Sequence, residues 1–253
     1  MFALHPVPSD LAPYVACFWT LEAAAGAEPH APIAPDGCCE WILHLADAPL
    51  VARNGGWRRQ PREFVFGQLR APLVLLSDRP MRCLAVRFHP YAVAPLLRIC
   101  GTALASEELA FASLGRHLSR WSSLCEQDCL GVALGGVIAE LRRLVGAARS
   151  IDALVVTACA RLGSPDDARI AALARRLETS ARTLERRFVA AVGLTPKRFA
   201  RIARMQRSLA ALAAPGARPA DVAHAMGFSD QAHFTRELVA LAGVRPGEVA
   251  NAA

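Results

Sequence analysis

The sequence predicts a multidomain α+β protein with a β-barrel or sandwich over residues 1–118 and an all-α domain with two helix-turn-helix units over residues 151–253. Three observations support this prediction: short apolar runs between turn residues in the first half, helical periodicity after residue 118, and a sequence repeat near the end. The 253 residues, 53% hydrophobic and 20% charged, are typical of a globular chain with two cores.

Short apolar runs in the first 118 residues have the length of β-strands. Pro, Gly, Asn and Asp bound them, as is usual where strands end in turns. The tripeptide Asn54-Gly55-Gly56 favours a hairpin turn, because Asn and Gly adopt a positive φ at low cost. A short helix near Ala92–Ile99 would close this domain. The predicted strands are the runs at residues 39–45, 63–66, 73–77 and 83–89.

The spacing of apolar residues becomes helical over residues 119–150. Ile138, Leu141, Leu144 and Val145 fall on one face of a predicted helix. Such a face suits either packing between the two domains or a homodimer interface, and the pattern favours neither.

Positive charge is concentrated in the C-terminal part. From Thr157 onward there are 15 Lys and Arg against 8 Asp and Glu, which accounts for the whole formal net charge of +7. This basic domain predicts a polyanionic partner, either nucleic acid or an anionic membrane surface. No apolar run approaches the roughly 20 residues of a membrane span, and the N-terminus lacks signal-peptide features, so we expect a cytoplasmic protein without a membrane partner.

The eight cysteines are scattered and contain no CxxC pair. A zinc site usually needs such pairs or a mixed Cys/His cluster, so no metal and no cofactor is predicted. We expect the thiols to act mostly as small buried hydrophobic groups.

The last hundred residues contain a repeat. Leu184, Arg186, Phe188, Gly193 and Pro196 recur fifty residues later. Upstream of these positions the offset is forty-nine, so one extra residue is expected between Ser229 and Phe234 in the second copy. The later partners of the first set are Phe234, Arg236, Leu238, Gly243 and Pro246, and the upstream pairs are Leu173 with Val222, Ala174 with Ala223, Leu177 with Met226 and Ser180 with Ser229.

Each copy has the parts of a helix-turn-helix unit. A small residue, Ala174 or Ala223, allows two helices to cross closely, and Ser180 or Ser229 is placed to cap the second helix. That helix buries two residues at i and i+4 and leaves a polar face. Arg can bind guanine and Gln can bind adenine through paired hydrogen bonds, so this face suits the major groove. The predicted base-reading residues are Arg182, Glu185, Arg186, Gln231, Thr235 and Arg236.

These motifs resemble the AraC/XylS family of bacterial transcription regulators. The match runs from residues 170–174 through 180–188 and 193–196 to Gly227-Phe-Ser-Asp-Gln-Ala-His-Phe-Thr-Arg236. The resemblance implies seven helices, with two recognition helices in successive major grooves joined by a long helix over about 196–213. We interpret the basic residues there as phosphate ligands rather than as a solvated face. The predicted backbone contacts are Ser180, Arg187, Lys197, Arg198, Arg201, Arg204 and Ser229.

The second copy departs from the family pattern after its recognition helix. Glu237, Val239 and Arg245 stand where basic residues and a Thr are expected, and Ala232 replaces a longer polar side chain. We therefore expect the second unit to contribute less affinity than the first.

The N-terminal half resembles a β-rich domain found ahead of AraC-type DNA-binding regions. The resemblance rests on Ile33-Ala-Pro-Asp-Gly37 and Ala85-Val-Arg-Phe-His-Pro90. It implies a cupin-like barrel that senses a ligand or mediates dimerisation. The alternative is that the tryptophans are core residues and the histidines ordinary surface residues. The candidate pocket residues are Trp19, Trp41, His44, Arg87 and His89.

Together these features predict a one-component transcription regulator rather than an enzyme. Its partners would be double-stranded DNA, a small-molecule effector, a second copy of the chain and, if it activates transcription, RNA polymerase. One alternative makes the N-terminal domain an enzyme, either cupin-type or an alkyl-transfer unit with a reactive thiol at Cys38 or Cys39. Another alternative is a structural DNA binder that recognises no specific site.

Overall fold

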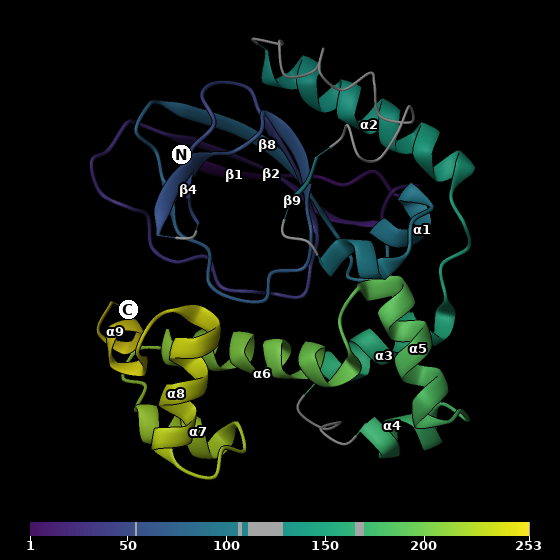
Figure 1. The fold of residues 1–253 in the computed structure, drawn as a ribbon, viewed down its shortest axis with the longest axis vertical. Helices are drawn as coiled ribbons and strands as arrows, with labels where there is room; N and C mark the ends of the chain where they lie inside the picture. The colour runs from purple at the N-terminus through teal and green to yellow at the C-terminus, as the bar shows by residue number, and fades with distance from the viewer. Residues whose placement is uncertain (54, 106–107, 111–128, 165–169, 253) are drawn as a thin grey trace.

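The computed structural model describes residues 1–53, 55–105, 108–110, 129–164 and 170–252. A β-rich domain lies on one side of the molecule and a helical domain on the other, with helix α6 running beneath the β-rich domain (Figure 1). The α+β organisation expected from the sequence is confirmed.

The larger sheet has six strands, and every pair of neighbours is antiparallel. In spatial order they are β1 (Phe2–His5), β2 (Val15–Ala23), β8 (Met81–Phe88), β3 (Glu40–His44), β6 (Glu63–Phe66) and β9 (Glu108–Ala110). The predicted strands at 39–45, 63–66 and 83–89 correspond to β3, β6 and β8, so periodicity located the centre of the sheet.

A smaller sheet of three strands faces the first. Its order is β5 (Gly56–Arg59), β4 (Leu50–Arg53) and β7 (Leu75–Leu76). Arg53 pairs with Gly56, which confirms the hairpin predicted at 54–56, although Asn54 lies outside the described residues. Gly55 has φ +78°, the left-handed conformation for which the turn needs glycine.

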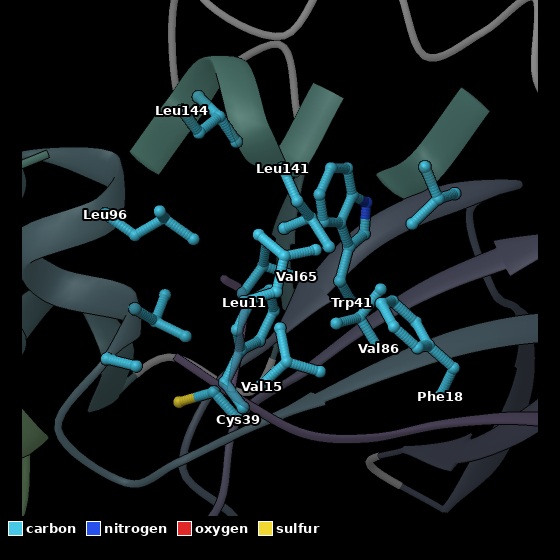
Figure 2. Packing of buried hydrophobic residues seen from close by; sticks show 14 of the residues in the cluster. Leu11, Val15, Phe18, Cys39, Trp41, Val65, Val86, Leu96, Leu141 and Leu144 are labelled. Atoms are coloured by element: carbon cyan, nitrogen blue, oxygen red, sulfur yellow. The ribbon is translucent and has the colours of Figure 1, made fainter. Parts of the chain in front are cut away.

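The two faces of the larger sheet have different surroundings. Because side chains alternate along a strand, Trp41 and Leu43 of β3 point to one face and Ile42 to the other. The first face carries the main core, which α1 (Val93–Leu97) and α2 (Leu130–Ala147) cover (Figure 2). The second face looks toward the small sheet and encloses a pocket.

Helix α2 is part of the β-rich domain. Its buried face, including Val137, Leu141 and Leu144, packs into the same core as Leu11 and Trp41. The apolar face predicted over 119–150 therefore packs inside one domain, and the residues of that segment before 129 lie outside the described residues. No helix among the described residues is long and apolar enough to cross a membrane.

Seven helices make up the described part of the C-terminal domain, as the family resemblance implies. Their buried aromatic residues, Phe188 and Phe234, are each 0% exposed, and each contributes roughly 1.5–3 kcal/mol by leaving water. The helices are α3 (Ala153–Gly163), α4 (Ile170–Arg176), α5 (Ala181–Val192), α6 (Pro196–Leu212), α7 (Pro219–Ala225), α8 (Gln231–Ala242) and α9 (Pro246–Ala252).

The two recognition helices, α5 and α8, begin differently. The Ser180 hydroxyl accepts a hydrogen bond from the Thr183 N–H, as predicted. In the second unit the cap is Asp230, whose carboxylate accepts from the His233 N–H at 2.6 Å, so the predicted cap at Ser229 is wrong. The extra residue of the second copy falls in the turn before Asp230 rather than after Ser229, which makes the turn one residue longer.

Candidate nucleic-acid interface and ligand pocket

The polar side chains predicted to read bases lie on the first two turns of α5 and α8. Arg182, Glu185 and Arg186 of α5 are exposed, as are Gln231 and Arg236 of α8. Side chains in this part of a helix reach base edges when its N-terminal end enters the major groove. The role of these residues in base reading remains a prediction.

Thr235 is less exposed than the other five residues predicted to read bases. It is half-buried, and its hydroxyl donates to the Gln231 carbonyl oxygen at 2.9 Å within the same helix. The second unit therefore presents fewer polar groups than the first, and its weaker contribution to affinity remains a prediction.

Both recognition helices point their reading ends away from the β-rich domain. The glycines that end them, Gly193 and Gly243, are equivalent positions of the repeat and have φ values of +82° and +73°. A Cβ added at Gly193 would lie 2.4 Å from the Gly101 carbonyl oxygen, and one added at Gly243 would lie 3.1 Å from Pro72. Because the C-terminal ends contact the β-rich domain, the N-terminal ends lie on the opposite side, toward α4 and α7 (Figure 1).

A basic cleft separates the two units. It has a volume of about 450 Å³ and runs along α6, with Leu162 and Ile170 on the side of the first unit and Met226 on the side of the second. Cationic side chains from α6 surround one carboxylate, so the cleft suits a DNA backbone that passes between two major grooves. These charged residues are Lys197, Arg201, Arg204, Arg207 and Glu237.

Glu237 joins α8 to α6. Its side chain is 9% exposed and lies 3.4 Å from Arg201, 3.0 Å from Arg204 and 3.6 Å from His233. Burial acts to raise the pKa of this carboxyl, but the hydrogen bonds and charges of Arg204 and Arg201 outweigh burial and hold the pKa below its usual value. The acidic residue that departs from the family pattern therefore fixes the orientation of the second unit.

Glu237→Gln is expected to lower the free energy of unfolding by about 1–2 kcal/mol at neutral pH, since two cations lose their charged acceptor. The pKa of Glu237 is lower in the folded chain, so this stabilisation is present above the unfolded pKa of about 4.3 and is lost as pH falls through the folded value. Urea denaturation across this pH range measures the difference. Glu185→Gln, an exposed change of the same type, serves as the control, and equal losses in both variants at neutral pH would contradict this assignment.

Two residues predicted to bind the DNA backbone have other partners. The Arg198 guanidinium donates to the Arg70 carbonyl oxygen of the β-rich domain at 2.9 Å, and its contact with phosphate remains a prediction. Its position on α6 turns it away from the basic cleft. Arg187 forms an ion pair with Asp152, the cap of α3, at 2.7 and 2.5 Å. Lys197, Arg201 and Arg204 line the cleft, and their contact with phosphate remains a prediction.

The loop of residues 33–37 connects the β-rich domain to α6. The Pro35 carbonyl oxygen accepts a hydrogen bond from Gln206 at 2.6 Å, and Gly37 packs against the Phe199 ring, where an added Cβ would lie 2.7 Å from a ring carbon. Gln68 donates to the Gly37 carbonyl oxygen at 3.0 Å and holds the loop from inside its own domain. Movement of this loop would therefore reach α6 directly.

A pocket lies between the two sheets of the β-rich domain. It has a volume of about 280 Å³, and Trp19, His44 and Arg87 line it, as the sequence analysis anticipated. The other two candidates are wrong. Trp41 points to the opposite face and stacks on Phe88 in the main core, and His89 contacts the Ala12 carbonyl oxygen and stacks on Tyr91.

Three polar pocket residues were missed in the sequence: Asp36, Glu40 and Gln60. Asp36 forms an ion pair with Arg87, and Glu40 lies 3.4 Å from the same guanidinium. The Trp19 indole N–H donates to Glu40 at 3.1 Å. Asp36 belongs to the motif at 33–37. The alternation along β3 places Glu40 on the same face of the strand as His44, so strand periodicity was the signal that could have found Glu40.

Burial changes the protonation of two of these groups. It raises the pKa of Glu40 to about 7, although the Trp19 hydrogen bond opposes the change. It lowers the pKa of His44 to about 4, so this imidazole is neutral at pH 7. The pocket thus holds a neutral hydrogen-bonding group at one end and a charged cluster at the other.

Comparisons with known proteins agree with this architecture. A helix-turn-helix domain family matches residues 173–252, and a domain family of unknown function matches residues 4–109. No curated protein matches the sequence. The structure of ToxT from Vibrio cholerae aligns with a TM-score of 0.50 and 12% identity, covering 92% of this chain and 98% of ToxT. ToxT bound to (E)-4-(8-methylnaphthalen-1-yl)but-3-enoic acid aligns with the same score and identity, covering 92% of this chain and 97% of ToxT.

The two helix-turn-helix units, the basic cleft between them and the matching domain family define a DNA-binding transcription regulator. Residues 173–252 belong to this helix-turn-helix domain family, and the fold of the whole chain is similar to that of ToxT.

Proposed function

We propose that this regulator responds to a small molecule bound in the pocket of its β-rich domain. The observation that carries this proposal is that the pocket and the contact with α6 share the loop of residues 33–37. Ala34 and Asp36 line the pocket, whereas Pro35 and Gly37 contact Gln206 and Phe199 of α6. A ligand that moved the loop would change both surfaces at once.

The pocket is connected more closely to the second helix-turn-helix unit than to the first. Leu73 lines the pocket, and its neighbour Pro72 packs against Gly243 at the end of α8. The first unit meets the loop of residues 33–37 through Phe199, but its other close contact, at Gly101, is not among the lining residues that the structure describes. We therefore propose that ligand binding shifts the second recognition helix relative to the first, which changes the half-site spacing that the protein accepts.

On DNA, we propose that the first turns of α5 and α8 read bases and that Lys197, Arg201 and Arg204 bind the backbone between them. The bases would be read by Arg182, Glu185, Arg186, Gln231 and Arg236, with a smaller part for Thr235. Operation on a promoter implies a cytoplasmic protein. A homodimer and a contact with RNA polymerase remain part of the proposal, and analytical ultracentrifugation with and without promoter DNA tests the first.

Asp36→Asn tests the coupling, because it weakens the ion pair to Arg87 without changing the size of the side chain. In footprinting on an operator selected from random DNA, we expect protection of the half-site bound by the second unit to change by about fivefold, a coupling of about 1 kcal/mol. Protection of the half-site bound by the first unit should change less, because that unit meets the loop only through Phe199 and Gly37. Asp78→Asn is the matched control, because Asp78 pairs with Arg59 at 2.9 and 2.5 Å in the same domain. Identical footprints for wild type and Asp36→Asn would refute the coupling.

A specific observation disfavours the alkyl-transfer alternative. Burial raises the pKa of the Cys38 and Cys39 thiols to about 12, whereas a nucleophilic cysteine needs a lowered pKa. We therefore propose that the β-rich domain has no catalytic role, and that mass spectrometry after exposure to alkylated DNA will show an unmodified chain.

A further inference from the structure

We infer that the pocket binds a small apolar molecule that carries a positively charged amine at one end and a hydrogen-bond donor at the other. This inference rests on the proposed function, because it assumes that the pocket is the effector site. Three features of the pocket carry it: its layered shape, the charges at one end and an unpaired acceptor at the other.

The strand registers arrange the pocket in layers. Arg87 lies opposite Glu40 at one end, Ala85 lies between Trp19 and Ile42 in the middle, and Cys83 lies opposite His44 at the far end. His44 lies four positions after Glu40 along β3, which corresponds to about 13 Å between their backbones. The middle layer is apolar, and the small side chain of Ala85 leaves room above the sheet. The pocket therefore suits an elongated ligand with a polar group at each end.

The charges at the first end favour a cation. Asp36 and Glu40 contribute two carboxyl groups, and Arg87 is the only Lys or Arg among the described lining residues. Both carboxyl groups already face its guanidinium. A ligand carboxylate would therefore meet the Asp36 carboxylate and the partly ionised Glu40, and it would have to share one occupied cation. An ammonium group would instead favour the ionised form of Glu40 and balance its charge.

At the far end one acceptor has no donor. His44 is 1% exposed, and its Nε2 faces the Gln60 Oε1 at 3.3 Å, so with the Gln60 amide in this orientation Nε2 carries the proton. Its Nδ1 is then an acceptor, and it has no partner among the described residues. A buried acceptor without a partner costs about 1–3 kcal/mol, and a ligand hydroxyl or N–H would remove that cost. The pocket volume of about 280 Å³ limits the ligand to a small molecule.

Four compounds that share one skeleton distinguish the contribution of the charge to binding from that of the hydrogen-bond donor. They are tyramine, phenethylamine, tyrosol and hydroxyphenylacetate. Isothermal titration calorimetry on the full chain is expected to show tyramine binding at least about tenfold more tightly than tyrosol, which lacks the charge. Phenethylamine, which lacks the hydroxyl, should fall between them, and hydroxyphenylacetate should show no binding. Glu40→Gln should weaken the binding of tyramine by about tenfold and leave the affinity for tyrosol unchanged. Asp78→Asn should change neither affinity.

The results distinguish this inference from the proposed function. Two results would overturn the amine assignment alone. One is that hydroxyphenylacetate binds as tightly as tyramine. The other is that Glu40→Gln lowers the affinities for tyramine and tyrosol equally. Failure of all four compounds to bind would also overturn it. The proposed function falls only if Asp36→Asn leaves the footprint of the second unit unchanged, a measurement that uses no ligand.

Discussion

Arg186→Ala is expected to weaken binding to the specific operator by about 1–3 kcal/mol, which corresponds to roughly one to two orders of magnitude in affinity, and to relax specificity at one base pair. Arg186 is exposed on the second turn of α5, on the side of that helix opposite the buried Leu184 and Phe188. Removing its guanidinium takes away a base contact without disturbing the core. Binding to random DNA should change little, which competition with random duplex measures.

Arg201→Ala provides the contrast, because Arg201 lies in the basic cleft on α6. A phosphate ligand carries no sequence information, so its loss should weaken specific and random duplexes alike and lower the salt dependence by about one phosphate contact. Equal losses on both kinds of DNA for Arg186→Ala would show that Arg186 binds the backbone as well. A melting curve for each variant checks that folding is unchanged.

Phe199→Ala is expected to have the largest effect on stability, about 3–5 kcal/mol. The Phe199 ring is 6% exposed, lies edge-on to Phe188 at 5.5 Å between ring centres and packs against Gly37 of the other domain. Its loss leaves a cavity in the first unit and removes the support of the loop at 33–37. Hydrogen exchange in that loop should therefore become faster, although the substitution lies in the other domain.

Phe228→Ala is the matched control for this effect. Phe228 is 8% exposed and packs on Phe234 at 4.9 Å and beneath the Arg204 guanidinium at 4.1 Å, all within the C-terminal domain. A similar loss of stability is expected, with no change in exchange at residues 33–37. If that loop keeps its protection in Phe199→Ala, the two domains are not coupled through α6.

Local patterns predicted much of the C-terminal domain. The repeat placed both recognition helices, and the buried positions Leu184, Phe188, Phe234 and Leu238 follow from i and i+4 spacing, which any amphipathic helix must satisfy. The joining helix ends one residue earlier than expected. The predicted cap of α8 was wrong because Ser and Asp are both good caps. The sequence alone does not say which of two adjacent capping residues begins the helix.

The pocket was predictable only in part. Trp19, His44 and Arg87 were found because aromatic and basic residues in strands suggest a binding face. Trp41 was misplaced because its direction depends on which face of β3 the helices cover, and a shift of one residue reverses it. That choice is made by α2, which is distant in the sequence and packs over Leu11 and Trp41.

By itself the sequence determined the class of protein: a two-domain α+β chain whose second domain repeats a helix-turn-helix unit. Its helical periodicity and concentrated positive charge are local properties that need no knowledge of the fold. Only the tertiary structure decided which partners the basic residues meet, because those of Arg198, Arg187 and Arg204 are far away in the sequence. It also decided that the recognition helices face away from the β-rich domain, since Gly193 and Gly243 contact that domain through close approaches that no sequence pattern encodes.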